Sequence, residues 1–200
     1  NIDIYGQRLN MSMESLFDGN GIPIANTPGL ETRPRTTFVN NTTSFVTWKS
    51  GDDNARILYQ FIDQDGLVFA EPKSVSGFDA IQTSPRVKRS SDGEIFIQWK
   101  DLRFDPVDGD IFMQKISTTG DVLWSDGVQV DVSEGVNFSG RYSANNAGGF
   151  NIFWEKGVYP EVDILFQSFD ENGQPLSEQP LEVANGDGYQ FAPNIIQGAG

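Results

Sequence analysis

Short runs in which apolar and polar residues alternate recur along the whole chain, and turn-forming pairs such as Asp92-Gly93 and Asn172-Gly173 separate them. Alternation with a period of two is typical of β-strands, and Asp-Gly or Asn-Gly pairs are typical of the tight turns between strands. None of the runs keeps a 3.6-residue period over the roughly 10–12 residues that a helix needs. The pattern therefore predicts an all-β protein made of many short strands.

Four of these runs share one pattern, in which glutamine is the fifth residue. The runs are DIYGQRLN from Asp3, RILYQFID from Arg56, DIFMQKIS from Asp110 and DILFQSFD from Asp163, and their starts lie 53, 54 and 53 residues apart. A second element, an apolar run ending in tryptophan, occurs three times, and each tryptophan follows an arginine by 13 residues: Arg35 and Trp48, Arg86 and Trp99, Arg141 and Trp154. A repeat of this length with four short strands is typical of a β-propeller blade.

The repeat therefore predicts one β-propeller region over residues 1–200, built of four-stranded blades of about 53 residues. In this phasing a half blade covers 1–30, complete blades cover 31–80, 81–135 and 136–186, and another blade begins at 187–200. The next tryptophan of the pattern would fall beyond Gly200, so we expect the chain to be an incomplete part of a larger propeller.

The repeated glutamines lie between apolar neighbours on one face of their strands, because side chains alternate across a strand. A buried amide without partners costs a few kcal/mol, on the order of the penalty for any unpaired polar group. We therefore expect a structural role, with each amide bound to the backbone of the adjacent blade or of the next turn. The alternative is a ring of ligand-binding amides formed by Gln7, Gln60, Gln114 and Gln167.

The repeated tryptophans share a strand face with aliphatic residues, as Trp99 does with Ile95 and Ile97. Such a face packs one blade on the next, as in any core between two sheets. We expect Trp48, Trp99 and Trp154 to be core residues, and the alternative is a platform for sugar rings.

The amino-acid composition excludes several kinds of catalytic site and of binding partner. The chain of 200 residues carries 14 Lys and Arg against 28 Asp and Glu, a formal net charge of −14, and it contains neither Cys nor His. Thiol nucleophiles, zinc–thiolate sites, Ser-His-Asp triads and imidazole bases are thereby excluded from it. So acidic a chain does not attract phosphate backbones or anionic membranes, and no apolar run approaches the roughly 20 residues of a membrane helix. We expect no nucleic-acid partner and no membrane insertion.

Two sets of charged residues are candidate sites. Arg35, Arg86 and Arg141 open the first strand of their blades, which is the innermost strand of a propeller blade, and there they could line the channel and hold an anion. The interpretation we favour is structural, with each arginine bonded to carbonyls or to an aspartate of the next blade, and Asn194 breaks the series.

The second set is Asp105, Asp108 and Asp110, which lie within six residues around Gly109. Carboxylates and carbonyls can bind Ca²⁺, although the spacing fits neither the EF-hand nor the calcium-binding nonapeptide. We favour a solvated turn, and therefore expect no cofactor, with Ca²⁺ as the alternative.

The order of motifs resembles a known group of proteins. D-I-Y-x-Q-R, then G-x-x-L-W, G-x-x-V, Pro, an apolar run with W and a D-x-R loop is similar to the propeller-type repeats of secreted Bacteroidetes cell-surface proteins, many of which end in a type IX secretion sorting domain. The best-matching strings are DIYGQRLN, GDVLWSDGVQV and WKDLR, and the D-x-R loop is present only as Asp101 and Arg103. The resemblance implies an extracellular or cell-surface location and supplies no catalytic residues.

Three functions are consistent with these observations. The sequence favours a non-catalytic module for adhesion or for binding a protein or glycan partner at the cell surface. One alternative is a glycoside hydrolase or lyase that uses carboxylates, since such chemistry needs neither His nor Cys. Its candidate acids break the repeat and are not grouped in the sequence: Glu94, Glu134, Glu155 and Asp187. The other alternative is a passenger or component bound to an outer-membrane type IX secretion machine.

Overall fold

The computed structural model describes residues 2–69, 71–133, 135–138 and 140–195. All of the regular secondary structure in these ranges is β-strand, and the strands number fifteen. Within the same ranges there is no helix with the length and apolar character that crossing a membrane would require.

The strands form four sheets in chain order, and every strand pairing is antiparallel. The first blade has only β1 (Ile4–Gly6) and β2 (Ile22–Ala25). The second has β3 (Glu31–Phe38), β4 (Ser44–Ser50), β5 (Arg56–Asp63), β6 (Gly66–Leu67) and β7 (Lys73–Ser74). The third has β8 (Gln82–Arg89), β9 (Ile95–Asp101), β10 (Asp110–Ile116) and β11 (Val128–Gln129). The fourth has β12 (Arg141–Ala144), β13 (Phe150–Val158), β14 (Glu161–Phe169) and β15 (Leu181–Ala184).

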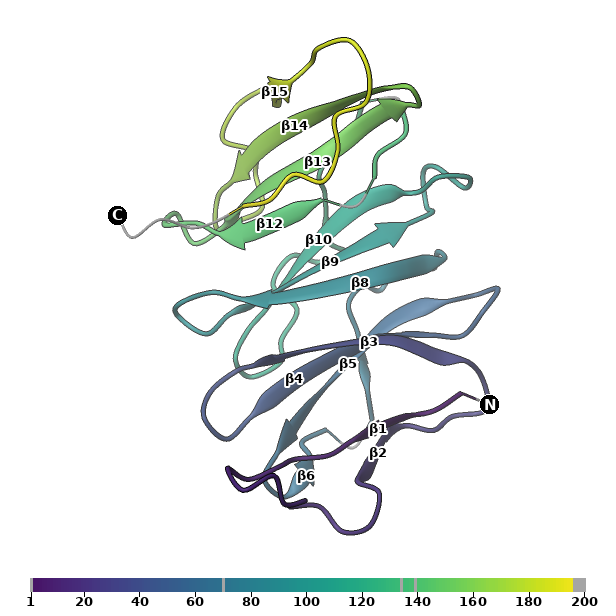
Figure 1. The fold of residues 1–200 in the computed structure, drawn as a ribbon, viewed down its shortest axis with the longest axis vertical. Helices are drawn as coiled ribbons and strands as arrows, with labels where there is room; N and C mark the ends of the chain where they lie inside the picture. Colours follow the sequence, from purple (N-terminus) through teal and green to yellow (C-terminus); the bar gives the residue numbers. More distant parts are fainter. Residues whose placement is uncertain (1, 70, 134, 139, 196–200) are drawn as a thin grey trace.

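The sheets follow one another along the long axis of the molecule, from the first blade to the fourth (Figure 1). Within the third and fourth blades the strands lie side by side in chain order. The second blade has five strands, because its fourth strand is interrupted and both β6 and β7 pair with β5. Successive antiparallel sheets packed face to face, two of them four-stranded, make this all-β chain a β-propeller, and the predicted fold class is confirmed.

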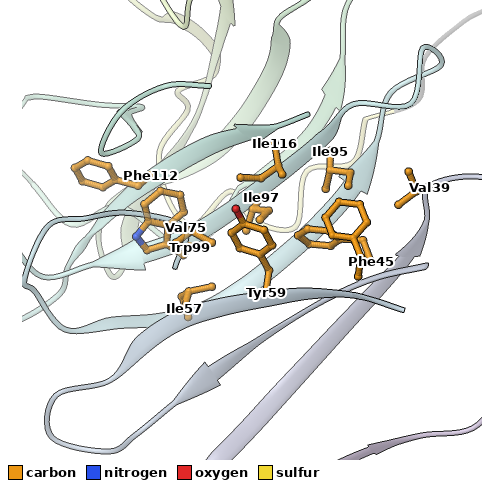
Figure 2. Packing of buried hydrophobic residues seen from close by; sticks show 11 residues of the cluster. Val39, Phe45, Ile57, Tyr59, Val75, Ile95, Ile97, Trp99, Phe112 and Ile116 are labelled. Carbon is orange, nitrogen blue, oxygen red and sulfur yellow. The ribbon is translucent and has the colours of Figure 1, made fainter. Parts of the chain in front are cut away.

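Each blade packs on the next through apolar side chains of opposite sheet faces. Between the second and third blades, Phe45, Ile57 and Tyr59 face Ile97 and Trp99 in one buried cluster (Figure 2). Equivalent clusters join the first blade to the second and the third to the fourth. Since the apolar area removed from water drives such packing, these three interfaces are the core of the molecule.

The three repeated tryptophans lie in these interfaces. Trp48, Trp99 and Trp154 are at most 1% exposed, and each belongs to the cluster between its own blade and the preceding one. No part of these rings faces solvent, so none of them offers a platform for a sugar ring.

The four repeated glutamines bind the backbone of the turn that follows their strand. Gln60 Nε2 donates to the carbonyl oxygen of Phe69 over 2.9 Å, and its Oε1 accepts from the N–H of Phe69 over 3.0 Å. Gln7 makes the same two contacts with Phe17. The amide of Gln114 binds Ser125 and Trp124 and also reaches Val75 of the preceding blade, and that of Gln167 binds Ser177. Three of these glutamines are buried, as expected; Gln7 is exposed, because no strand pairs with the second edge of β1 among the described residues.

Candidate ligand-binding site on the inner strands

The first strands of the blades, β3, β8 and β12, gather along one side of the molecule. Each is an edge strand of its sheet. β3 and β8 contact each other, whereas the described last strands of these blades show no comparable contact with one another. These first strands are therefore the inner strands of the propeller (Figure 1). They carry the arginines that the repeat singles out.

A β-bulge interrupts two of the inner strands, β3 and β8, just before the repeated arginine. The register of β3 shifts between Thr32 and Arg35, and that of β8 shifts between Thr83 and Arg86. The bulged residues adopt left-handed backbone conformations, with φ of 55° at Arg33 and 56° at Ser84. Bulges re-aim the side chains that follow them, and left-handed non-glycine residues collect at functional sites.

The same backbone conformation recurs near the end of the described chain, where Ala192 has φ 56°. In all three places proline follows the left-handed residue, and the repeat position of the arginine comes next: Pro34, Pro85 and Pro193 precede Arg35, Arg86 and Asn194. The inner edge of each of these repeats is therefore built in one way, whichever side chain it presents.

The three arginines occupy one register position. Their cross-strand partners are the residues directly before the tryptophans: Thr47 for Arg35, Gln98 for Arg86 and Phe153 for Arg141. Directly opposite residues share a sheet face. Arg86 thus lies on the face of Phe96, which packs on the fourth blade, and Arg35 lies on the face of Phe45, which packs on the third. Each of these two arginines extends toward the inner strand of the next blade.

This placement brings positive charges together. Burial and then the nearby Arg141 and Arg35 lower the pKa of the Arg86 guanidinium. Burial and then Arg141 and Arg86 lower the pKa of Lys88, whose ammonium lies 5.5 Å from the centre of the Tyr142 ring. Like charges at interaction distance disfavour their charged forms. The four cations are therefore one electrostatic cluster that crosses three blades.

The inner strands have few negative charges to balance this cluster. They hold six of the 14 cationic residues of the chain, namely Arg33, Arg35, Arg86, Lys88, Arg89 and Arg141. Their one carboxylate is Glu31, which is buried and accepts hydrogen bonds from Trp48 and Ser50. All five ion pairs within the described ranges join cations of other segments. A chain with a net charge of −14 thus has a locally positive inner edge.

The aspartates of the 105–110 loop do not converge. Asp105 accepts from the N–H groups of Val107 and Asp108, which closes a turn. Asp110 is 7% exposed, and burial raises the pKa of its carboxyl, as do Asp105 and Asp131 nearby. Across the described ranges, no three acidic side chains stand close enough together to hold a metal ion.

A lysine supplies the cation of this loop. The ammonium of Lys100 donates to the carbonyl oxygens of Asp108 and Gly109, each over 2.9 Å, and to that of Asn137. Burial lowers the pKa of Lys100, which the aspartates of the loop partly offset. The carbonyls that a Ca²⁺ ion could use here already bind an ammonium group.

The sequence did not predict the buried carboxylates that accept hydrogen bonds from the tryptophans. The indole N–H of Trp48 donates to Glu31 over 2.6 Å, and that of Trp154 donates to Asp131 over 3.3 Å. These acids lie 17 and 23 residues away from their tryptophans in the chain, so no fixed spacing reveals them. Asp131 also pairs with Lys156 over 2.9 Å. They complete the blade interfaces and have no exposed edge for catalysis.

None of the described acids considered for a hydrolase lies on an inner strand. Glu94 pairs with Lys115 over 2.6 Å. Glu155 accepts from the N–H of Ala192 over 2.7 Å, and Asp187 is exposed in the segment after β15. Glu134 lies outside the described residues. The three described acids therefore lie on different segments, and two of them are bound to other parts of the chain.

Comparisons with known proteins bear on the fold. No protein-family model matches the chain, and no curated protein matches it. Among solved structures, it is similar to a thermostable family-43 glycoside hydrolase at 12% identity, with a TM-score of 0.44, covering 76% of this chain and 55% of that one. It is also similar to an endo-arabinase from Bacteroides thetaiotaomicron at 11% identity, with a TM-score of 0.45, covering 80% of this chain and 66% of that one.

At this identity the likeness concerns the fold. The chain spans just over half and about two thirds of the lengths of these two relatives.

Proposed function

We propose that the chain is a non-catalytic binding module of an extracellular or cell-surface protein, and that it holds a glycan or protein partner at the inner strands of the propeller. One observation carries the proposal: Arg35, Arg86 and Arg141 occupy one register position on neighbouring inner strands, and the bulges before Arg35 and Arg86 give both the same approach. A repeated polar position along a shared edge favours recognition of an extended partner.

The chemistry of this edge supports binding over hydrolysis. Glycoside hydrolysis uses two carboxyl groups about 5–10 Å apart, one on each side of the scissile bond. The inner strands present guanidinium and ammonium groups instead, and their one carboxylate is buried under Trp48. Guanidinium groups orient a ligand through paired hydrogen bonds but do not transfer protons at neutral pH.

The test has two arms that use the same purified chain. In the first, a glycan array and a pull-down from cell-surface extracts measure binding, with Arg141→Gln as the site variant and Lys49→Gln as a matched control, because Lys49 pairs with Asp52 outside the inner strands. We expect the control to retain the partner and the site variant to lose it.

In the second arm, a panel of polysaccharides is incubated with the chain and reducing ends are measured. Hydrolysis that a single Asp or Glu substitution abolishes would overturn the proposal in favour of the glycoside hydrolase. Co-purification with an outer-membrane translocon, without any glycan or other protein ligand, would equally overturn it in favour of a secretion passenger.

A further inference from the structure

The first blade leaves one edge of its glutamine strand unpaired. The glutamine strands β5, β10 and β14 each lie between two strands of their sheets, whereas β1 pairs only with β2 among the described residues. Tyr5 and Leu9, in the first glutamine segment, are 56% and 46% exposed. Their counterparts in the third blade, Phe112 and Ile116, are at most 2% exposed. Such an edge presents backbone N–H and C=O groups that a further strand can bind.

A groove of about 820 Å³ lies along this edge, between the first and second blades. Residues 4–9 of the first blade and residues 34–38 of the second line it, together with Val46 of β4 and Ile62 of β5. One blade further on, β4 contacts the inner strand β8 of the following blade. The groove therefore lies where a strand equivalent to β4 would contact β3.

The other three blades show which strand pairs with a glutamine strand. Each glutamine strand pairs antiparallel with a tryptophan strand, in one register: Trp48 opposite Leu58, Trp99 opposite Phe112 and Trp154 opposite Leu165. The residues opposite the tryptophans correspond to Tyr5 in the repeat. A tryptophan strand in this register would place its indole opposite Tyr5 and the aliphatic residue two positions earlier opposite Gln7.

Arg8 adds a charge preference to the groove. Its counterpart in the third blade is Lys115, which pairs with Glu94 over 2.6 Å and lies 5.9 Å from the centre of the Phe96 ring. Arg8 lines the groove and takes part in none of the ion pairs of the described residues. A strand with the E-x-F-x-x-W spacing that begins at Glu94 would therefore offer Arg8 both an acidic group and an aromatic ring.

We propose that the free edge of β1 is a docking site for one extended strand of the tryptophan type, supplied by another repeat of this kind, which pairs antiparallel with β1 and fills the groove. This site goes beyond the binding function proposed above, because β1 is not an inner strand. Backbone hydrogen bonds supply the affinity, and the side chains opposite Tyr5 and Arg8 supply the specificity. A folded second copy is a poorer occupant, because its tryptophan strands β4, β9 and β13 are each paired on both sides.

Isothermal titration calorimetry tests the site with the purified chain and a synthetic peptide, EIFIQWKDLR, which copies residues 94–103. We expect saturable binding of one peptide per chain and no binding of a scrambled peptide of the same composition. Equal binding of the scrambled peptide would overturn the proposal, because the groove would then lack register. A dimer of the chain that the peptide does not dissociate would also overturn it, in favour of a second copy.

Backbone methylation of the peptide separates strand pairing from binding through side chains alone. Successive N–H groups of a strand point to opposite edges, so N-methylation at alternate residues blocks one edge only. One of the two alternately methylated peptides should lose binding and the other should keep it. Equal affinities of the two would overturn the pairing with β1.

Side-chain substitutions test the register. Replacing the tryptophan of the peptide by alanine should weaken binding about tenfold or more, as expected for a buried aromatic anchor. In the chain, Tyr5→Ala should weaken binding about twofold to fivefold, the range of a cross-strand pair. The matched control is Tyr159→Ala, because Tyr159 is 76% exposed in the fourth blade and should not affect the peptide. Equal effects of the two tyrosine variants would overturn the register.

The charge preference is tested by a double-mutant cycle of Arg8→Gln in the chain and Glu94→Gln in the peptide. Each change alone should weaken binding about twofold to fivefold, as expected for a partly exposed ion pair. The second change should add little once the first is present. Fully additive losses would show that the two groups do not pair and would overturn the role of Arg8.

Discussion

The indole N–H of Trp99 donates a hydrogen bond to Oδ2 of Asp101 over 2.9 Å, although the two residues are only two positions apart in β9. The same carboxylate receives the guanidinium of Arg103 over 2.7 Å, and both side chains of this ion pair are at most 4% exposed. The guanidinium carbon of Arg103 lies 4.4 Å from the centre of the Phe78 ring and 4.2 Å from that of Phe112. The D-x-R loop thus closes the interface between the second and third blades.

Removing the charge of Asp101 should therefore destabilise the protein strongly. Asp101→Asn leaves the guanidinium of Arg103 buried without its counter-ion, and breaking one side of a buried pair costs about 3–5 kcal/mol. Urea denaturation measures the free energy of unfolding. The matched control is Asp52→Asn, because the Asp52 side chain is 73% exposed and lies 3.7 Å from Lys49, and such a pair should contribute at most about 1 kcal/mol. Equal costs for the two variants would contradict the structural role of the buried pair.

The folded state should lose stability in acid as the buried carboxylates that bind the tryptophans become protonated. Burial alone would raise the pKa of Asp101, but hydrogen bonds from Arg103 and Trp99 hold it below its ordinary value of 3.8. At Asp131 burial likewise raises the pKa, but hydrogen bonds from Ser133 and Lys156 outweigh it, so the pKa of this carboxyl is also lowered. A carboxyl whose pKa is lower in the folded state stabilises the fold above the unfolded-state value, and that contribution disappears as the pH falls through the folded-state pKa.

The melting temperature should thus be nearly constant between about pH 5 and pH 7 and drop below about pH 4 as these two groups protonate. In Asp101→Asn the drop should be shallower, because one of the buried carboxyl groups with a lowered pKa is gone. A slope that is identical in the variant and the parent chain would contradict the assignment.

The glutamine that binds each turn should contribute more to the free energy of unfolding where its side chain is buried than where it is exposed. Gln60→Ala leaves the N–H and carbonyl of Phe69 without their partner, which costs about 1–3 kcal/mol for each buried group left unsatisfied. Gln7 makes the same contacts with Phe17 but is exposed, so water replaces the amide in Gln7→Ala and the cost should stay below about 1 kcal/mol. Denaturation midpoints compare the two variants, and a larger loss at Gln7 would contradict this order.

The bulge before the arginines should tolerate only residues that accept a left-handed backbone. Ser84 has φ 56°, where a branched side chain is strained, so Ser84→Val should cost about 1–2 kcal/mol while Ser84→Gly should be close to neutral. Thr83→Val is the control in the same strand, since Thr83 is not among the residues with positive φ. Equal effects of valine at positions 83 and 84 would show that the bulge does not require this conformation. Thermal unfolding measures all three variants.

The sequence predicted the elements that repeat and missed those that do not. The period near 53 residues and the 13-residue gaps identified the propeller, because each blade uses the same turn and core positions. The acids that bind the tryptophans were not predicted, because Glu31, Asp101 and Asp131 reach the indoles from different places in the repeat. The role of Lys100 was equally hidden, because it depends on a carbonyl 37 residues away.

A repeated proline in the sequence marks the position of the bulge. Proline follows the left-handed residue at Pro34, Pro85 and Pro193, directly before the repeated polar position. The electrostatic cluster needed the structure, because strand order decides which cations lie next to one another. The strand register puts the arginines at equivalent positions. Lys88 comes under the influence of Arg141 only because the third and fourth blades pack on each other.

The bulge also bears on how such a protein can change its ligand. Since the backbone before positions 35, 86 and 194 is shaped by the left-handed residue and its proline, the side chain at these positions can vary without altering the strand that carries it. Asn194 already has a neutral side chain where the second, third and fourth blades have arginine. Each blade thus contributes one replaceable position to a common edge, and new specificities could evolve by single substitutions there, independently of the tryptophan and glutamine positions that hold the blades together.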